Sequence, residues 1–165
     1  VSAPTESIDV MPTILKRLGL TPPDTVDGRS LCPFFDGASP DKWRAHTFSE
    51  LDYGDPVSPG PVQRALGLDA RDANLALLRT DTQTLVHFNG GLPAMLFDHA
   101  AEGEQRDCAD TAPESVLRLT RAMLDHRMSH PQGRFAQTMI TGAGVRRTPR
   151  HGPADAPLER LAKVS

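Results

Sequence analysis

The stretch NLALLRTDTQTLVHFNGGLPAMLFDH, residues 74–99, decides the fold of this chain. It holds three short apolar runs with turn residues between them: 74–80, 84–90 and 93–99, separated by Asp81-Thr82 and by Gly90-Gly91. Short apolar runs bounded by turn residues predict β-strands. Because a parallel crossover needs a dozen or more residues, connections this short predict antiparallel pairing.

The flanking sequence predicts a further strand and a covering helix. HTFSEL, residues 46–51, is a fourth candidate strand. Thr111 and Pro113 provide a cap and a first-turn proline for a helix that ends near Ser129. One side of that helix is expected to cover the sheet through six residues: Val116, Leu117, Thr120, Met123, Leu124 and Arg127. The fold class is therefore predicted to be α+β, with a small antiparallel sheet of about four strands covered by a helix.

The chain opens on a second helical pattern, SIDVMPTILKRLG at residues 7–19. Ser7 or Asp9 can cap this helix, and Gly19 can end it. Apolar residues recur at helical spacing along one face that needs a partner: Ile8, Met11, Ile14, Leu15 and Leu18. The turn-rich segment that follows carries a small apolar plug: Leu31, Phe34 and Phe35.

Composition limits the classes of function. The 165 residues match the length of one domain, and fifteen prolines and thirteen glycines indicate a loop-rich chain. A net charge of -3 gives no field for nucleic acid or an anionic membrane, and no apolar run approaches the roughly 20 residues of a membrane-spanning helix. Cys32 and Cys108 form no disulfide framework, so we expect a cytoplasmic location. A chain that begins at Val1 is also expected to start inside a longer product.

Six blocks in order carry a resemblance to a known family: IDVMPTILKRLG, DGRSLCPFF, FSELDYGD, NLALLRTD, VHFNGGLPAMLFDHAAEGEQRDCAD and MLDHRMSH. Together they resemble the C-terminal region of sulfatase-type hydrolases in the alkaline phosphatase superfamily. They are most similar to the phosphonate monoester hydrolases and their arylsulfatase relatives. The similarity runs from about Glu6 to Val145.

The resemblance implies four parts. Residues 1–40 would be a docking helix and plug that belong to a missing catalytic domain, and residues 41–130 the sheet and helix. Residues 131–145 would be an extended arm that could reach a neighbouring subunit in a homo-oligomer. Residues 146–165 are expected to be a disordered tail.

The resemblance also implies where the chemistry lies. These enzymes use a formylglycine made from a Cys/Ser-x-Pro-x-Arg motif and a divalent metal, both in the N-terminal domain. Cys32 and Cys108 do not stand in that motif. We therefore expect this chain to hold no catalytic residues, no metal and no cofactor. It would supply cleft wall and scaffold to a hydrolase of sulfate or phosphonate/phosphate monoesters, be inactive alone, and have the N-terminal domain and a small ester as partners.

A few residues are candidates for the rim of the substrate cleft. Asp52 and Tyr53 lie in the acidic segment SELDYGDP, which enters a variable loop in the family, although a solvated acidic loop is the alternative interpretation. His87 alternates with Val86 and Phe88 in a strand and could border a cleft, or be an ordinary hydrogen-bonded sheet residue.

Three further features leave alternatives open. His126 and His130 have a spacing that can ligate zinc, or they mark a helix end where the dipole favours cations. Glu104 matches the family's glutamate, but Thr84 stands where relatives have a cation, so a charge role at that position is expected to be lost. The whole chain could instead be a non-enzymatic orphan domain or interaction module left by gene truncation.

Overall fold

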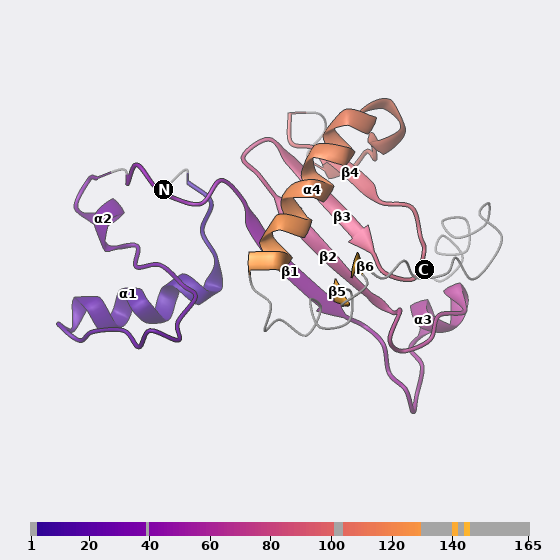
Figure 1. Ribbon diagram of the computed structural model, residues 1–165, viewed down its shortest axis with the longest axis horizontal. Helices are drawn as coiled ribbons and strands as arrows, with labels where there is room; N and C mark the ends of the chain where they lie inside the picture. The colour runs from indigo at the N-terminus through magenta and orange to yellow at the C-terminus, as the bar shows by residue number, and fades with distance from the viewer. Residues whose placement is uncertain (1–2, 39, 101–103, 130–139, 142–143, 146–165) are drawn as a thin grey trace. The chain divides into compact units, whose positions relative to one another are not determined.

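The chain divides into two compact units, Val1–Thr47 and Phe48–Ser165. Both are seen in a computed structural model (Figure 1), which describes the residues in five ranges: 3–38, 40–100, 104–129, 140–141 and 144–145. The predicted tail, 146–165, lies outside the described residues, as does most of the predicted arm.

The second unit is a four-stranded antiparallel sheet with the strand order β1-β2-β3-β4. Its main elements follow in chain order: β1 (Thr47–Asp52), α3 (Pro61–Leu66), β2 (Asn74–Arg79), β3 (Gln83–Phe88), β4 (Met95–Asp98), η3 (Ala109–Thr111) and α4 (Pro113–Ser129). The long helix α4 crosses one face of the sheet (Figure 1). This arrangement confirms the predicted fold class and all four predicted strands.

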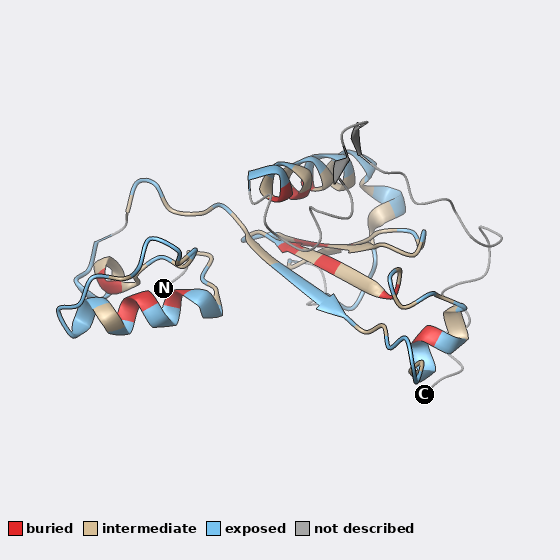
Figure 2. Cartoon of the chain, turned by 60° about the horizontal axis from the view of Figure 1, so that its bottom comes forward, coloured by how far each residue is buried: buried red, intermediate tan, exposed pale blue. Residues whose placement is uncertain are grey.

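The register places one hydrophobic core between the sheet and α4. Leu78 pairs with Leu85 across β2 and β3, and Leu85 pairs with Leu96 across β3 and β4. Because alternate strand residues point to opposite faces, these side chains share the face that α4 covers. The core is made by six almost completely buried residues: Ala76, Leu78, Leu85, Leu96, Leu119 and Met123 (Figure 2).

One predicted core position on α4 is wrong. Leu117 is 54% exposed, whereas Leu119, which the sequence analysis leaves out, is buried. Leu119, Met123 and Arg127 follow one another at four-residue intervals and therefore share a face. A residue two positions away from Leu119 lies on the far side of the helix, which is why Leu117 faces outward.

The short helix α3 is absent from the sequence-based prediction. It has Pro61 at its first position and Gly67 just past its end, where Gly67 takes a left-handed backbone with φ of 64°. Proline at the start and glycine after the end are the usual boundary signals of a helix. These two signals could have revealed α3, although six residues are too few for an apolar periodicity.

The first unit contains η1 (Ser7–Asp9), α1 (Val10–Arg17) and α2 (Cys32–Phe35). Gly19 has a φ of 73°, in agreement with its predicted role in ending the first helix. The buried side of this helical segment is Asp9, Pro12 and Thr13. The predicted apolar face is instead about half exposed or more: Ile8, Met11, Ile14 and Leu18, together with Val10 and with Phe35 of the plug.

Two short strands are described beyond α4, within the predicted arm. They are β5 (Ile140–Thr141) and β6 (Gly144–Val145), which pair antiparallel. In the part of the chain that the structure describes, no helix combines the length and apolar character needed to cross a membrane.

Candidate functional site

The predicted rim residues begin at the end of β1. Asp52 is the last residue of this strand, and its Oδ1 accepts a hydrogen bond from the N–H of Gly54 at 3.1 Å. The N–H of Tyr53 still donates to the carbonyl of Ala73 beside β2, at 2.9 Å. Successive residues of an extended, paired backbone point to opposite faces of a sheet. Asp52 and Tyr53 therefore project to opposite sides, and burial raises the pKa of the Tyr53 phenol.

His87 lies on the face of the sheet that α4 covers. It is two residues from the core residue Leu85 on β3 and pairs with buried Ala76 of β2. Burial lowers the pKa of the His87 imidazole, and the nearby positive charge of Arg127 lowers it further. His87 is therefore predominantly neutral at neutral pH.

The three predicted rim residues do not converge on one point. Asp52 shares the α4 side of β1 with Phe48, which packs against the core, because the two are four residues apart in the strand. His87 lies on that same face, and Tyr53 lies on the other. The face that α4 covers is therefore the one where candidate polar groups gather.

An ion pair between a buried arginine and an exposed glutamate stands at this face, between α4 and β1. Nη2 of Arg127 is 3.5 Å from Oε1 of Glu50, and the arginine side chain is only 3% exposed against 36% for the glutamate. Burial lowers the pKa of Arg127 to about 10 against the attraction of Glu50. Burial likewise raises the pKa of Glu50, and Arg127 opposes that shift. Arg127 is still mainly cationic at neutral pH and carries the positive charge of this face.

Aromatic rings complete the surroundings of Arg127. Its guanidinium carbon lies 5.6 Å from the centre of the Phe48 ring, within range of a cation–π interaction. The ring of Phe48 in turn packs against the ring of His126, with 4.4 Å between ring centroids. His126 is thus part of this cluster, and the other half of the predicted zinc pair, His130, lies outside the described residues.

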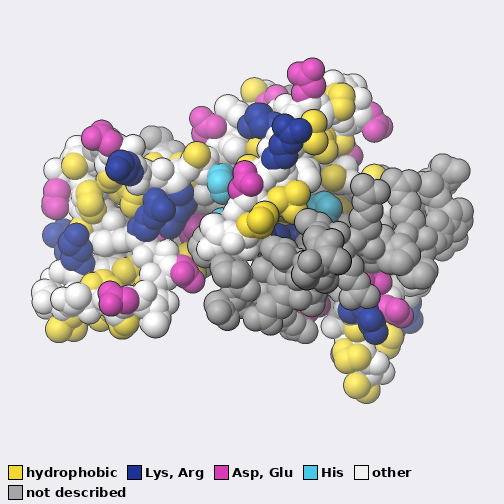
Figure 3. Space-filling model, in the orientation of Figure 1, with side chains coloured by type: hydrophobic (Ala, Val, Ile, Leu, Met, Phe, Trp, Pro, Cys, Tyr) yellow, Lys and Arg dark blue, Asp and Glu magenta, His cyan; other side chains and the backbone are white. Residues whose placement is uncertain are grey.

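The acidic segment after β1 is held as a tight turn. Oδ1 of Asp55 accepts hydrogen bonds from the N–H groups of Ser58 and Val57, at 2.9 and 2.8 Å. These two bonds lower the pKa of the Asp55 carboxyl. Figure 3 shows hydrophobic side chains at the tip of this loop, where Val57 is 90% exposed. The Asp55 carboxylate is thus engaged by backbone N–H groups of its own turn.

The base of the same loop is fixed by close backbone packing. A Cβ on Gly54 would lie 2.1 Å from the carbonyl oxygen of Ala70, so only glycine fits there. The buried amide of Gln63 on α3 accepts a hydrogen bond from the N–H of Asp55 at 2.9 Å and donates to the carbonyl of Leu68 at 3.3 Å. The loop that begins beside Asp52 is therefore built to hold one conformation.

A second polar cluster lies on the sheet face opposite α4. The hydroxyl of Thr84 donates to Oε1 of Glu104 at 2.7 Å, Arg79 forms an ion pair with the same oxygen, and Nε2 of His99 lies 3.1 Å from it. The Thr84 hydrogen bond, then the charge of Arg79 and that of His99, lower the pKa of Glu104 against the effect of burial. Position 84 itself carries no charge, but Arg79 pairs directly opposite Thr84 and supplies a positive charge beside it.

The first unit is organised around a fully buried carboxylate, Asp9. Arg44 pairs with both of its oxygens, with 2.7 Å between Nη2 and Oδ1. The backbone N–H groups of Arg29 and Glu6 donate to it at 2.8 and 2.9 Å. Burial raises the pKa of Asp9, but the bonds from Arg44, Arg29 and Glu6 outweigh it, so the pKa is lowered. Asp9 is a structural anion whose acceptor sites are already used.

The motif Asp27-Gly28-Arg29 explains how the backbone N–H of Arg29 comes close enough to bond to the Asp9 carboxylate. A Cβ on Gly28 would lie 2.0 Å from the carbonyl oxygen of Ile8, so the close approach needs glycine. The hydroxyl of Thr13 then donates to the carbonyl of Asp9 at 2.6 Å and accepts from the N–H of Leu31 at 2.8 Å. These contacts tie α1 to the segment that follows it.

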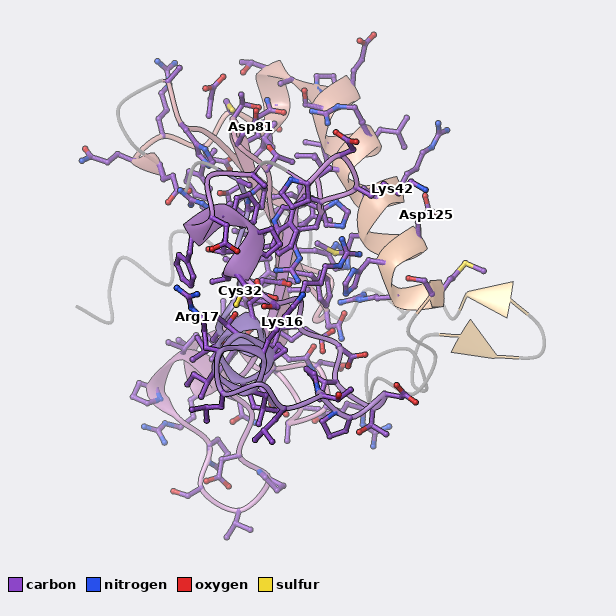
Figure 4. The ribbon with its side chains drawn as sticks, turned by 90° about the vertical axis from the view of Figure 1, so that its left-hand side faces the viewer. Lys16, Arg17, Cys32, Lys42, Asp81 and Asp125 are labelled. Carbon is purple, nitrogen blue, oxygen red and sulfur yellow. The ribbon has the colours of Figure 1, made fainter. Side chains whose placement is uncertain are left out.

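Both cysteine thiols face backbone carbonyls. The thiol of Cys32 on α2 is buried and directed at the carbonyl of Thr13 on α1, at 3.8 Å (Figure 4). The thiol of Cys108 donates to the carbonyl of Leu96 at 3.2 Å. Across the described ranges, no group of three or more histidine, cysteine and acidic residues is close enough together to hold a metal ion.

Comparisons with known proteins identify the relatives of the chain. No family model matches it. It is 35% identical over 142 residues to the multifunctional alkaline phosphatase superfamily protein PehA from Trinickia caryophylli, covering 78% of this chain and 27% of that protein. The solved phosphonate monoester hydrolase SpPMH from Silicibacter pomeroyi matches with a TM-score of 0.73 and 44% identity, over 91% of this chain and 30% of that one.

A more distant structure shares the fold alone. A putative sulfatase from Bacteroides thetaiotaomicron matches with a TM-score of 0.59 and 21% identity, over 90% of this chain and 30% of its own. The chain thus spans about 30% of the length of the proteins it resembles. The resemblance to sulfatase-type and phosphonate monoester hydrolases of the alkaline phosphatase superfamily is confirmed.

Proposed function

We propose, from the premise that this chain is a relative of phosphonate monoester hydrolases and sulfatases, that it forms the C-terminal, non-catalytic part of such a hydrolase. The substrates would be small sulfate or phosphonate/phosphate monoesters. One observation carries the proposal: 91% of the chain corresponds to 30% of a phosphonate monoester hydrolase at 44% identity. In this role the chain supplies scaffold and part of the cleft wall.

The residues of this chain do not fit the groups that such a hydrolase uses. A formylglycine needs a Cys/Ser-x-Pro-x-Arg motif, whereas Cys32 and Cys108 lie in other sequences and their thiols face backbone carbonyls. The described residues also offer no three-ligand set for a divalent metal. In this proposal the metal and the formylglycine belong to residues outside this chain.

The contribution to the cleft rim comes from the α4 side of the sheet. Asp52 and His87 lie on that face, close to the charge pair of Glu50 and Arg127. A neutral imidazole such as His87 can donate and accept a hydrogen bond at once, which suits contact with an ester substrate. Tyr53 projects from the other side of β1 and would border the cleft only from the adjoining loop.

The apolar side of α1 is proposed to dock on the catalytic part. Ile8, Met11, Ile14 and Leu18 are each about half exposed or more in this chain. A contiguous row of exposed apolar side chains marks an interaction surface. The opposite side of the helix is already satisfied by the contacts of Asp9 and Thr13.

The isolated chain provides the first test. Purified protein is incubated with an aryl phosphonate monoester or an aryl sulfate, in the presence of a divalent metal, and release of the phenol is followed. We expect no turnover above the buffer rate. Hydrolysis that a chelator abolishes would place the catalytic groups inside this chain and overturn the proposal.

The exposed face of α1 also favours a second candidate function, a non-enzymatic interaction module. Size-exclusion chromatography with light scattering and a thermal melt separate the two. A chain that lacks its covering domain should self-associate through this face. An independent module should be monodisperse and melt cooperatively. A homo-oligomer formed through the predicted arm, 131–145, stays a prediction.

A further inference from the structure

We propose that His99 is a proton-operated clasp that fixes the side chain of Glu104 to the β2–β3 hairpin. The clasp consists of Arg79, Thr84, His99 and Glu104, which come from β2, β3 and the two ends of one connection. It closes fully when the His99 imidazole carries two protons and opens in part when it carries one. This inference does not depend on the hydrolase proposal.

The proton on Nδ1 of His99 is fixed by its partner. Nδ1 lies 3.0 Å from the backbone carbonyl of Asp81, and a carbonyl can only accept a hydrogen bond. Nδ1 must therefore be protonated for this contact to form. The state of the other ring nitrogen, Nε2, then decides the charge of the ring.

Nε2 faces a carboxylate, which can only accept a hydrogen bond, and a hydroxyl, which can donate or accept one. It lies 3.1 Å from Oε1 of Glu104 and 2.9 Å from the hydroxyl oxygen of Thr84. With Nε2 protonated, His99 donates to this pair, and the single hydroxyl proton of Thr84 is given to Glu104 at 2.7 Å. Every contact of the cluster is then made, and Glu104 is paired with two cations, Arg79 and His99.

Loss of the Nε2 proton breaks this arrangement. An unprotonated Nε2 is an acceptor and cannot hydrogen-bond to a carboxylate, so it accepts a hydrogen bond from the hydroxyl of Thr84 in place of Glu104. Glu104 then loses both the Thr84 hydrogen bond and the His99 cation and keeps Arg79 alone. The two protonation states of His99 therefore correspond to two hydrogen-bond patterns of the same four side chains.

Other charges around His99 do not replace this contact. Asp81 offers its backbone carbonyl, and the carboxylate of Asp98 on β4 accepts the N–H of Ala100 at 2.9 Å. Arg79 disfavours a second cation, but it shares the carboxylate oxygen with His99 and is itself half exposed, which weakens the repulsion. The closed clasp therefore needs an ionised Glu104 carboxylate beside a doubly protonated His99 ring.

The backbone at Glu104 has an unfavourable conformation that the contacts of the clasp stabilise. Glu104 has a φ of 69°, in the left-handed region that is unfavourable for a residue with a side chain. Among the described residues it is the non-glycine position with a positive φ. The contacts of the Glu104 side chain with its three partners offset the unfavourable backbone conformation. When some of these contacts are lost, the conformation is less well stabilised.

Amide hydrogen exchange at His99 tests the proposal on the full 165-residue chain. The N–H of His99 donates to the carbonyl of Thr82 at 2.8 Å, so its protection reports on opening of the backbone at His99 itself. Protection factors, corrected for intrinsic exchange, are compared at pH 5.5 and pH 8 in the wild type, His99→Gln and Glu104→Gln. His46→Gln, in the first unit, is the matched control.

We expect protection in the wild type to be about two- to fivefold higher at pH 5.5 than at pH 8, relative to His99→Gln, as for a partly exposed ion pair. Glu104→Gln should lose the same difference, and His46→Gln should keep it. His87 contributes equally to all four proteins and cancels. Equal profiles in the wild type and His99→Gln, or higher protection at pH 8, would overturn the proposal.

A measurement on the wild type alone gives an independent decision. The ring ¹⁵N shifts of His99 should show Nδ1 protonated at both pH 5.5 and pH 8. A neutral ring that carries its proton on Nε2 would contradict the hydrogen bond to Asp81 on which the clasp depends.

Discussion

Removal of the buried carboxylate of Asp9 should unfold the first unit. Asp9→Ala removes the carboxylate that pairs with both ends of the Arg44 guanidinium, which is 10% exposed, and leaves it only the longer contact to Glu6 at 3.2 Å. It also leaves the N–H groups of Arg29 and Glu6 without their acceptor. Breaking a buried ion pair from one side costs about 3 to 5 kcal/mol. A unit of this size, with a small buried core, is not expected to withstand that loss.

The single tryptophan reports on this unit directly. Trp43 lies 5.2 Å from the guanidinium of Arg44, and its indole N–H donates to the carbonyl of Pro4 at 2.7 Å. We expect Asp9→Ala to shift Trp43 emission to the red and to lower or abolish its urea midpoint. Glu104→Gln, in the second unit, is the control that should leave the Trp43 transition in place.

The double variant Asp9→Ala, Arg44→Met separates the parts of this cost. It removes the guanidinium that has lost its main carboxylate partner, so stability should be partly regained. Recovery stays incomplete because two backbone donors lack an acceptor, at about 1 to 3 kcal/mol each. A Trp43 transition that Asp9→Ala moves by less than about 0.5 kcal/mol would refute the reasoning, since such a change is typical of surface sites.

The remaining predictions concern three other sites. The lowered pKa of His87 means that its neutral form stabilises the fold above about pH 6.5, and this stability is lost as the pH falls below that value. His87→Gln should therefore make the urea midpoint of the second unit depend less on pH between 7.5 and 5. Gly28→Ala, whose Cβ would lie 2.0 Å from the carbonyl of Ile8, should destabilise the first unit by more than about 1 kcal/mol in the Trp43 assay, whereas Gly60→Ala points into open space and should stay within about 0.5 kcal/mol. Leu78→Ala in the completely buried core should cost about 2 to 5 kcal/mol in circular-dichroism melts with urea, and an effect below 1 kcal/mol would contradict the assigned core.

The sheet could be predicted from the sequence because its signals are local. The runs within residues 74–99 alternate with turn residues, and the short connections leave antiparallel pairing as the available arrangement. The face of His87 also followed from simple alternation along β3. Leu117 shows the limit of this reasoning, since an apolar residue on a helix need not lie on its buried side.

The polar clusters could not be predicted because their members are distant in sequence. Arg127 meets Glu50 across 77 positions, and Arg44 meets Asp9 across 35. Neither arginine stands in a pattern that names its partner, and ion pairing depends on the packing of α4 or of the first unit. The resemblance to a family pointed to Asp9 and Glu104 as parts of motifs, but only the structure shows the charges that hold them.

A chimera tests the central claim most directly. The part of SpPMH that corresponds to this chain is replaced by residues 1–145, and hydrolysis of an aryl phosphonate monoester is measured beside intact SpPMH and SpPMH truncated at the same junction. If this chain is the non-catalytic scaffold of such a hydrolase, the chimera should be active and the truncated protein should not. A folded, metal-loaded chimera with no more activity than the truncated protein would contradict the account.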